Sequence, residues 1–136
     1  MGHAPLIFLD THALVWTVAC EDRLSRPAAS AIRRARNRDG IAVADVVIWE
    51  IAFLLVRGVL RAHSTIERTV ENFIVRSGVT VQSITPEIAT IAAQFPDSYP
   101  KDPIDRIIGA TARAAGMALV TKDERIRSSG LVKTIW

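Results

Sequence analysis

Four of the fourteen acidic residues in the chain could act together in one chemical site, namely Asp10, Glu50, Asp105 and Asp123. Carboxylates that gather at one point repel each other, and a hard divalent cation relieves that repulsion. Because no set of Cys or His residues accompanies them, their oxygens favour Mg²⁺ or Mn²⁺ over zinc. A cation held in this way positions a phosphodiester, lowers the pKa of an attacking water and stabilises the leaving oxygen. If the four side chains meet, they predict metal-dependent phosphodiester hydrolysis.

Glu50 is the acidic residue whose own neighbours are hardest to explain otherwise. On a helix, the residues three and four positions away from it are Val46, Val47, Phe53 and Leu54, all of them apolar. An ionised carboxylate in an apolar stripe is unfavourable unless it binds a cation or pairs with an opposite charge. A metal ligand is our preferred interpretation, and a salt bridge to a distant arginine is the alternative.

The other three carboxylates have simpler explanations when each is taken alone. Asp10 directly follows one apolar run and Asp123 comes shortly after another, so either could cap a helix or belong to a turn. Asp105 falls in the first turn of a helix that Asp102 is expected to cap, where the helix dipole favours a negative charge. Only the positions of these residues in the fold can therefore show whether they serve function or local structure.

The elements that position these residues alternate along the chain. Short apolar runs predict strands at residues 6–9, 41–44, 79–84 and 118–121, with a fifth at 131–136. Periodicity and capping residues predict helices at 12–19, 25–38, 45–57, 64–76, 85–94 and 102–116, with a loop at 95–101. Apolar strands separated by helices are typical of a mostly parallel sheet covered on both faces. We therefore expect one three-layer α/β domain, with a central sheet flanked by helices, over residues 1–136.

This topology brings the four carboxylates to one edge of the sheet. Crossover helices run antiparallel to the strands, so their first turns lie at the carboxyl ends of the strands. Glu50 and Asp105 are in the early turns of two such helices, and Asp10 and Asp123 follow strand ends. Open parallel sheets bind ligands at this edge. Cations must also offset the repulsion between the carboxylates and a polyanionic substrate, and Arg106 and Lys122 are candidates for substrate contact.

Composition sets wider limits on the class of protein. Hydrophobic residues make up 49% of the chain, which excludes a disordered protein, and the net charge of +3 allows a polyanionic partner without requiring one. Cys20 is the only cysteine, which suggests a reducing compartment. The longest apolar region, residues 46–56, is interrupted by Glu50 and is too short to span a bilayer. We expect a soluble, cytoplasmic protein without membrane contact.

Four segments occur in a fixed order: LDTHALVW at residues 9–16, WEIA at 49–52, DPIDR at 102–106 and LVTKD at 119–123. Each segment is weak evidence alone, but the ordered set covers nearly the whole chain. In these segments the chain resembles the PIN-domain ribonucleases, and specifically the VapC-type toxins of type II toxin–antitoxin pairs. The fold that the resemblance implies is the three-layer PIN domain.

The resemblance also implies an activity, a cofactor and partners. It implies an endoribonuclease that cleaves cellular RNA, with Mg²⁺ or Mn²⁺ bound by the catalytic residues Asp10, Glu50, Asp105 and Asp123. It places Thr11 and Thr121 beside the site, and we treat Asp102 as a cap or supporting residue there. It further implies a homodimer and a cognate VapB-type antitoxin that covers the site. Trp16, Trp49 and Phe53 could contribute to that contact, and core packing is the alternative for them.

Two other functions remain open at this point. Val47 and Leu54 stand where relatives often carry serine and lysine, which motivates a non-catalytic module that binds RNA or a partner on the same fold. A receiver-type phosphoryl-transfer domain is disfavoured, because the chain lacks a pair of acids at one strand end. The carboxylates argue for a metal-dependent reaction, whereas RNA as the substrate comes mainly from the resemblance.

Overall fold

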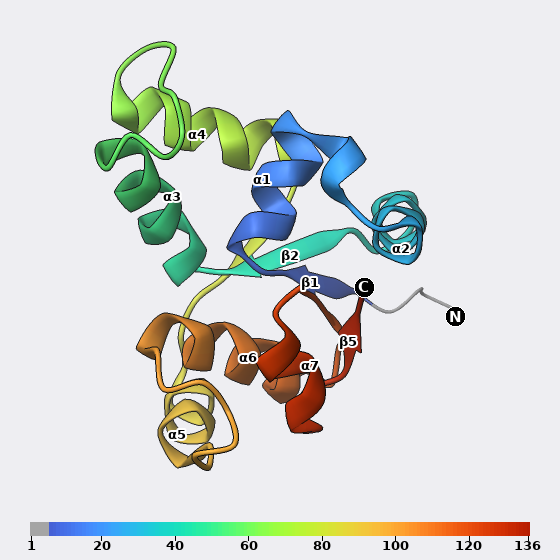
Figure 1. Cartoon of the computed structure of the whole chain (residues 1–136). Coiled ribbons are helices and arrows are strands. Elements are labelled where there is room, and N and C mark those ends of the chain that lie inside the picture. Colours follow the sequence, from blue (N-terminus) through green and yellow to red (C-terminus); the bar gives the residue numbers. More distant parts are fainter. Residues whose placement is uncertain (1–5) are drawn as a thin grey trace.

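A five-stranded sheet in which every neighbouring pair is parallel forms the middle layer of the protein (Figure 1). The computed structural model describes residues 6–136, so residues 1–5 of the predicted domain lie outside the described residues. The strand order is β3-β2-β1-β4-β5, which places β1 at the centre. The strands are β1 (Ile7–Leu9), β2 (Ile41–Ala44), β3 (Thr80–Gln82), β4 (Leu119–Val120) and β5 (Thr134–Ile135). The predicted α/β class is confirmed.

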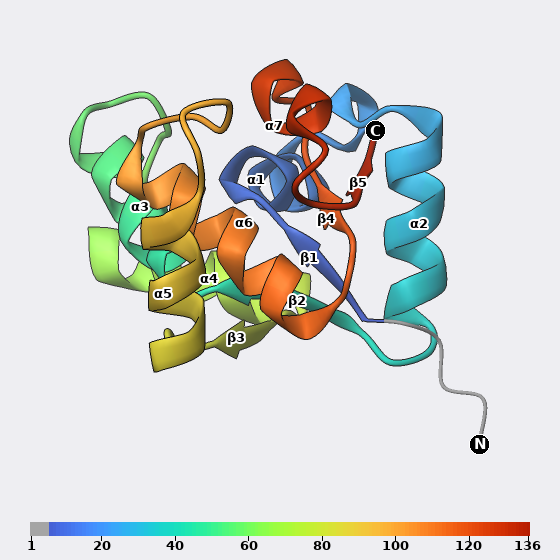
Figure 2. The ribbon, with the colours of Figure 1, turned by 90° about the horizontal axis from the view of Figure 1, so that it is seen from below.

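Helices cover both faces of this sheet, which gives the three predicted layers. In Figures 1 and 2, α1, α3 and α4 lie together on one face, and α5 and α6 lie side by side on the other. The long helices are α1 (Thr11–Ala19), α2 (Arg26–Arg36), α3 (Val46–Val56), α4 (Ile66–Ser77), α5 (Pro86–Gln94) and α6 (Pro103–Ala115), and η1 (Glu21–Arg23) is a single 3-10 turn. Within residues 6–136, each helix is too short or too polar to cross a bilayer.

Burial explains why the three central strands form where they do. Every residue of β1, β2 and β4 is buried. Phe8, in the central strand, pairs with Ala42 of β2 on one side and with Leu119 of β4 on the other. A parallel strand with helices above and below has no solvent-facing side, so an uninterrupted apolar run is stable there. This core holds the carboxyl ends of β1 and β4 next to each other.

The strand β3 differs from the buried strand predicted at residues 79–84. Only Thr80–Gln82 pairs with the sheet, and both Thr80 and Gln82 are exposed. Ile84, which the sequence placed inside the sheet, is 45% exposed. The reason is that β3 is an edge strand with β2 as its one neighbour, so fewer elements cover it. The prediction of a buried strand is therefore wrong at this edge of the sheet.

A seventh helix, α7 (Glu124–Ser129), lies between β4 and β5, where the sequence predicted none. Asp123 caps its first turn, and Gly130 ends it with a φ of 71°, in the left-handed region that glycine adopts readily. Six residues make fewer than two helical turns, which is too short for an apolar period to be recognised. This helix borders the edge of the sheet where β4 ends.

Candidate active site

One open pocket, with a volume of about 770 Å³, collects all four predicted carboxylates at the carboxyl ends of β1 and β4. Asp10, Glu50, Asp105 and Asp123 line it together with two further acidic residues, Asp102 and Glu124. The backbone N–H of Asp10 donates to the carbonyl of Val120 at 3.1 Å, which ties the ends of the two strands together. Residues from four separate elements therefore meet at the edge of the sheet where the topology predicted them.

Asp10 is held by α1 and by β4. Its side chain accepts a hydrogen bond from the backbone N–H of Ala13 at 2.8 Å and so caps α1. Burial raises the pKa of Asp10, and the nearby charge of Glu50 raises it further, whereas hydrogen bonds from Thr121 and Ala13 lower it. The net shift is upward, so this carboxylate carries its charge in a setting that disfavours it.

Thr121 connects two of the acidic residues. Its side chain is completely buried at the end of β4. The hydroxyl bonds to the side chain of Asp10 and accepts a hydrogen bond from the backbone N–H of Asp123 at 3.1 Å. The hydroxyl therefore links the side chain of Asp10 to the backbone of Asp123, a residue far away in the sequence.

Glu50 lies in the second turn of α3 and points into the pocket rather than into the core. The hydroxyl of Thr11 donates a short hydrogen bond to its Oε1. Val47, one turn earlier, is fully buried, but Phe53 is 41% exposed and stacks on Trp49. The apolar neighbours therefore do not enclose Glu50 as the sequence suggested. Among residues 6–136 no arginine pairs with it, so the predicted alternative of a salt bridge does not apply there.

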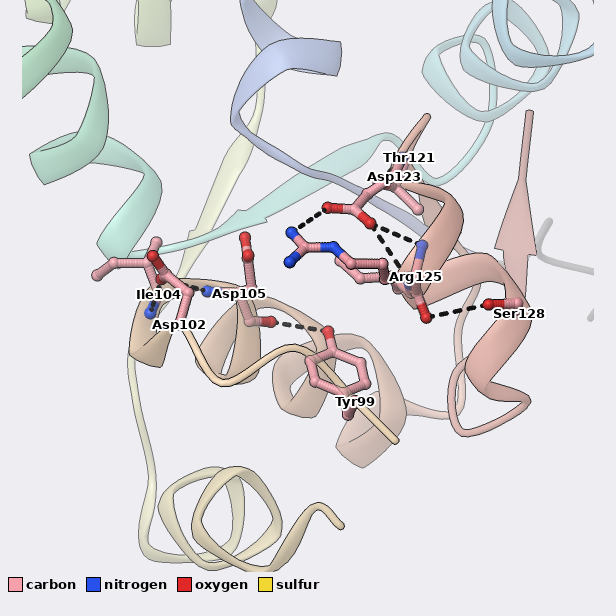
Figure 3. Close-up of polar contacts among 9 residues, drawn as sticks. Tyr99, Asp102, Ile104, Asp105, Thr121, Asp123, Arg125 and Ser128 are labelled. Carbon is pink, nitrogen blue, oxygen red and sulfur yellow. Dashed lines mark hydrogen bonds and ion pairs between the residues drawn. The ribbon is translucent and has the colours of Figure 1, made fainter. Parts of the chain in front are cut away.

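Asp102 and Asp105 have different roles at the start of α6. Asp102 accepts hydrogen bonds from the backbone N–H groups of Ile104 and Asp105, at 2.8 and 3.2 Å, and caps the helix as predicted. Asp105 directs its carboxylate towards the pocket (Figure 3). Burial raises the pKa of Asp105 to about 6, and the charges of Asp102, Glu50 and Asp123 add to the effect. Burial and the neighbouring carboxylates thus disfavour the charged form of Asp105.

Arg125 is a cation of the site that the sequence did not reveal. Its Nη2 lies 3.2 Å from Oδ2 of Asp123, and Figure 3 shows the guanidinium between Asp123 and Asp105. Burial alone would raise the pKa of Asp123, but the hydrogen bonds from the side chain and backbone of Arg125 outweigh it and lower that pKa. The sequence signal for Arg125 is its position two residues after Asp123. Because helix α7 was not predicted, the direction of the Arg125 side chain could not be inferred.

The donor chemistry of the pocket fits a hard divalent cation. Six carboxylates line one pocket, and burial, with a smaller contribution from neighbouring carboxylates, raises the pKa values of Asp10 and Asp105. Carboxylate oxygens are the ligands that Mg²⁺ and Mn²⁺ prefer. In residues 6–136, however, no three His, Cys, Asp or Glu side chains already surround a common point. The side chains would therefore have to come closer together to surround an ion.

The two predicted substrate contacts occupy different places. Lys122 lines the pocket, and its Nζ lies 5.9 Å from the centre of the Trp16 ring. Arg106 does not line that pocket. Its guanidinium donates to four backbone carbonyls around the connection between α5 and α6, those of Ala92, Phe95, Pro96 and Pro100, at 2.6 to 3.2 Å. Arg106 therefore holds that connection against α6.

Three aromatic residues also line the pocket: His12, Trp16 and Trp136. The sequence allowed Trp16 a place in core packing or in partner contact, and it indicated no role for Trp136. His12 and Trp16 are four residues apart on α1 and so share one face of that helix. Asp10 caps this helix, so both rings are carried by an element that begins at one of the carboxylates.

Comparison with known proteins gives consistent matches over the whole fold. A PIN-domain profile matches residues 7–130. Ribonuclease VapC22 from Mycobacterium tuberculosis is 37% identical over 126 residues, which cover 90% of each chain. Among solved structures, VapBC2 from Rickettsia felis, bound to a promoter DNA fragment, has a TM-score of 0.71 at 12% identity and covers 95% of this chain and 96% of that one. FitAcB from Neisseria gonorrhoeae has a TM-score of 0.66 at 14% identity, covering 94% and 95%. At such identities the two structures support the fold alone.

Proposed function

This chain belongs to the PIN-domain family, and from that premise we propose that it is a Mg²⁺- or Mn²⁺-dependent endoribonuclease, the VapC-type toxin of a type II toxin–antitoxin pair. The observation that carries the proposal is the meeting of Asp10, Glu50, Asp105 and Asp123 in one pocket. The similarity to a protein named Ribonuclease VapC22 supports RNA as the substrate. Hydrolysis of a phosphodiester is the reaction that an oxygen-ligated divalent cation suits.

In this proposal Asp10, Glu50, Asp105 and Asp123 hold the cation and act as the catalytic residues. When bound, the cation would position the scissile phosphate, activate a water and neutralise charge on the leaving oxygen. Thr11 supports the site by donating to Glu50, which keeps one carboxylate oxygen oriented.

Two further residues keep the acids in place without touching the substrate. Asp102 binds the backbone at the start of α6, which leaves the neighbouring carboxylate of Asp105 free to face the pocket. Thr121 links the side chain of Asp10 to the backbone of Asp123. Outer residues of this kind orient the ligands of a metal and tune their basicity.

Substrate contact outside the acids is proposed for Lys122. It is exposed at the pocket wall, where an ammonium group can approach a phosphate of the RNA backbone. Arg106 is left out of the proposed contacts, because its donors are engaged with backbone carbonyls. A phosphate chain that approaches six carboxylates needs such a cation, since the acids alone would repel it.

Partner contacts belong to the proposal as well. Trp49, Phe53, Val56 and Val59 are 54%, 41%, 66% and 68% exposed, and they lie along α3 and just after it. Apolar side chains exposed together mark contact sites on soluble proteins. We assign this surface to protein contact, within a homodimer or with a VapB-type antitoxin that covers the pocket. Structural neighbours include a toxin–antitoxin complex from Klebsiella pneumoniae, which agrees with such a partner. The expected location is the cytoplasm, where RNA is present.

The test is cleavage of RNA by the purified chain with Mg²⁺ or Mn²⁺ and with EDTA. Asp10→Asn and Glu50→Gln should each reduce the cleavage rate by at least about a hundredfold, since each removes a charged ligand of the cation. Glu71→Gln is the matched control, because Glu71 is exposed on α4 and does not line the pocket. Cleavage that persists in EDTA, or equal cleavage by all three variants, would contradict the proposal.

A non-catalytic module that binds RNA or a partner on the same fold is the second candidate. The observation in its favour is that side chains of residues 6–136 do not already surround an ion. Calorimetry distinguishes the two. RNA binding without any heat of Mg²⁺ or Mn²⁺ binding supports the non-catalytic module, and metal binding that Glu50→Gln weakens supports the nuclease.

A further inference from the structure

The pocket has a second wall whose chemistry differs from that of the carboxylates. His12, Trp16, Lys122 and Trp136 line it, so two of the three tryptophans in the chain face the same space as the acids. His12 and Lys122 are exposed, and Trp16 and Trp136 are partly exposed. Large aromatic rings that only filled the core would be covered on both faces. This wall therefore presents aromatic surface to whatever enters the pocket.

Ring geometry separates this wall from the other aromatic pairs among the described residues. Trp49 and Phe53 stack with an angle of 19° between their planes, and Phe95 and Tyr99 stack at 25°. The two pairs that involve Trp16 are tilted instead, at 52° to His12 and 55° to Trp136, with centroids 5.6 and 5.8 Å away. Neither of these two rings lies parallel to Trp16. The stacking capacity of its indole is thus not used by His12 or Trp136.

Two cations accompany the indole of Trp16. The guanidinium carbon of Arg23 lies 5.8 Å from its ring centre, and Nζ of Lys122 lies 5.9 Å from it. Cations at such distances are attracted to the face of an indole. Lys122 also directly precedes Asp123 in the sequence, and both residues line the pocket. A phosphate can bind there while a flat group rests against the ring.

The fold connects the two walls through the backbone. His12 and Trp16 belong to α1, the helix that Asp10 caps, so ring and carboxylate share one short element. Trp136 follows β5, and the backbone N–H of Thr121 donates to the carbonyl of Ile135 at 3.2 Å. The backbone that carries the aromatic wall is therefore joined to the strand ends that carry the acids.

From this arrangement we propose that Trp16, flanked by His12 and Trp136, is a subsite that stacks the base of one unpaired RNA nucleotide next to the phosphate at the carboxylates. The inference rests on the proposed ribonuclease function. A nucleotide offers what the two walls require, a phosphate for the cationic and metal-binding side and a flat base for the indole. Paired bases are stacked inside a duplex, so the subsite accepts single strands or loops. Because every base has an aromatic face, it selects an unpaired nucleotide rather than one base type.

The experiment measures RNA affinity in a background that leaves the RNA intact. The parent is the Glu50→Gln chain with Mg²⁺, and the probes are one short, fluorescently labelled single-stranded RNA and a series of analogues that each lack one base. Fluorescence anisotropy gives the dissociation constant of each pair. Stacking on an aromatic side chain is worth enough that Trp16→Leu should weaken binding of the intact RNA by about tenfold. The parent should bind one analogue in the series more weakly than the intact RNA by a similar factor, because that analogue lacks the base that stacks on Trp16.

The decisive comparison is the double-mutant cycle between the ring and the base. For that one analogue, Trp16→Leu should cause no further loss, since the base that stacks on the ring is already absent. Trp16→Phe, which keeps a ring, should bind the intact RNA within about threefold of the parent. Phe73→Leu removes an aromatic ring from α4 outside the pocket and should leave the affinity unchanged. Thermal melting of each variant shows that it is folded.

Other outcomes overturn the subsite in distinguishable ways. If Trp16→Leu weakens binding of every analogue by the same factor, the ring acts only on the shape of the pocket. The stacking proposal then fails, while the proposed ribonuclease function stands. If Trp16→Leu leaves RNA affinity unchanged but breaks a complex with the antitoxin, the wall is a protein contact and the proposal also fails. If the wild-type chain cleaves no RNA and the parent binds none, the proposed function fails together with the subsite.

Discussion

Replacement of Asp105 by asparagine should make the metal-free protein more stable at neutral pH. The structure raises the pKa of this carboxyl from its ordinary value of 3.8 to about 6, through burial and the charges of Asp102, Glu50 and Asp123. A carboxyl with a raised pKa in the folded state favours folding only while it is protonated. Its contribution is present below about pH 4 and is lost as the pH rises through about 6. Above that range the folded chain holds an unfavourable charge, which asparagine removes.

The magnitude follows from the size of the shift. At about 1.4 kcal/mol for each pH unit, a change from 3.8 to about 6 corresponds to roughly 3 kcal/mol. Asp105 is still partly open to water, which screens the repulsion, so about half of that is a better expectation. Asparagine also gives up the favourable interaction of a carboxylate with the first turn of α6, worth about 0.5 kcal/mol. We expect Asp105→Asn to raise the free energy of unfolding by about 1 kcal/mol.

Urea denaturation in EDTA, at several pH values between about 4 and 8, measures this difference. The gain should be largest at neutral pH and should vanish near pH 4, where both chains are uncharged at position 105. Asp123→Asn is the matched control with the opposite sign. Because Arg125 lowers the pKa of Asp123, its charge contributes stability above about pH 4, and the substitution should destabilise the protein at neutral pH.

Addition of Mg²⁺ should reverse the order of the wild-type protein and Asp105→Asn. A ligand that binds the folded state alone stabilises it in proportion to the logarithm of its concentration over its dissociation constant. Only the wild-type chain keeps all four carboxylates, so it should gain more stability from the ion. An Asp105→Asn chain that is no more stable than the wild type in EDTA, or whose gain does not depend on pH, would refute the account of repulsion among the acids.

Three further substitutions test other parts of the structure. A Cβ atom on Gly109 would lie 2.0 Å from the hydroxyl oxygen of Tyr99, so Gly109→Ala should destabilise the protein by about 1–3 kcal/mol in urea. Adding Tyr99→Phe should recover part of that loss; an undisturbed single variant would contradict the close packing. Arg106→Met should cost about 2 kcal/mol of stability, because it leaves the carbonyls between α5 and α6 without donors, while RNA affinity of the folded protein stays the same. A fall in affinity at unchanged stability would return Arg106 to the substrate contacts. Arg125→Gln should tighten Mn²⁺ binding about two- to fivefold in calorimetry, because it removes the cation that competes for Asp123; unchanged affinity would show that Arg125 does not compete.

The sequence predicted most of what depends on local patterns. The apolar runs of β1, β2 and β4 are buried on both sides, and that burial is what makes a strand recognisable without its neighbours. The strand ends then located Asp10 and Asp123, and the helix start located Asp105. The topology predicted that these residues lie together, because parallel strands with crossover helices have only one edge where these positions meet.

Features that depend on contacts between distant segments could not be predicted in the same way. Arg106 binds carbonyls of residues 92 to 100, and a backbone carbonyl leaves no trace in the sequence. The sequence singled out Glu50 because its neighbours on the helix are apolar. This reason holds only in part, since Phe53 is exposed. Trp136 reaches the pocket because β5 pairs with β4, a register that apolar content does not specify. Each of these needs the packed structure.

The position of β1 in the middle of the sheet has a consequence for the time at which the pocket comes into existence during synthesis. Leu9 pairs with Val120, so the central strand waits for its second neighbour until residue 120 has been made. Asp10 and Glu50 leave the ribosome early, whereas Asp105 and Asp123 follow much later. A growing chain that ends before α6 carries two of the acids, without the partners that complete the site. A nascent chain that already includes α7 is therefore the first that can bring all four carboxylates together.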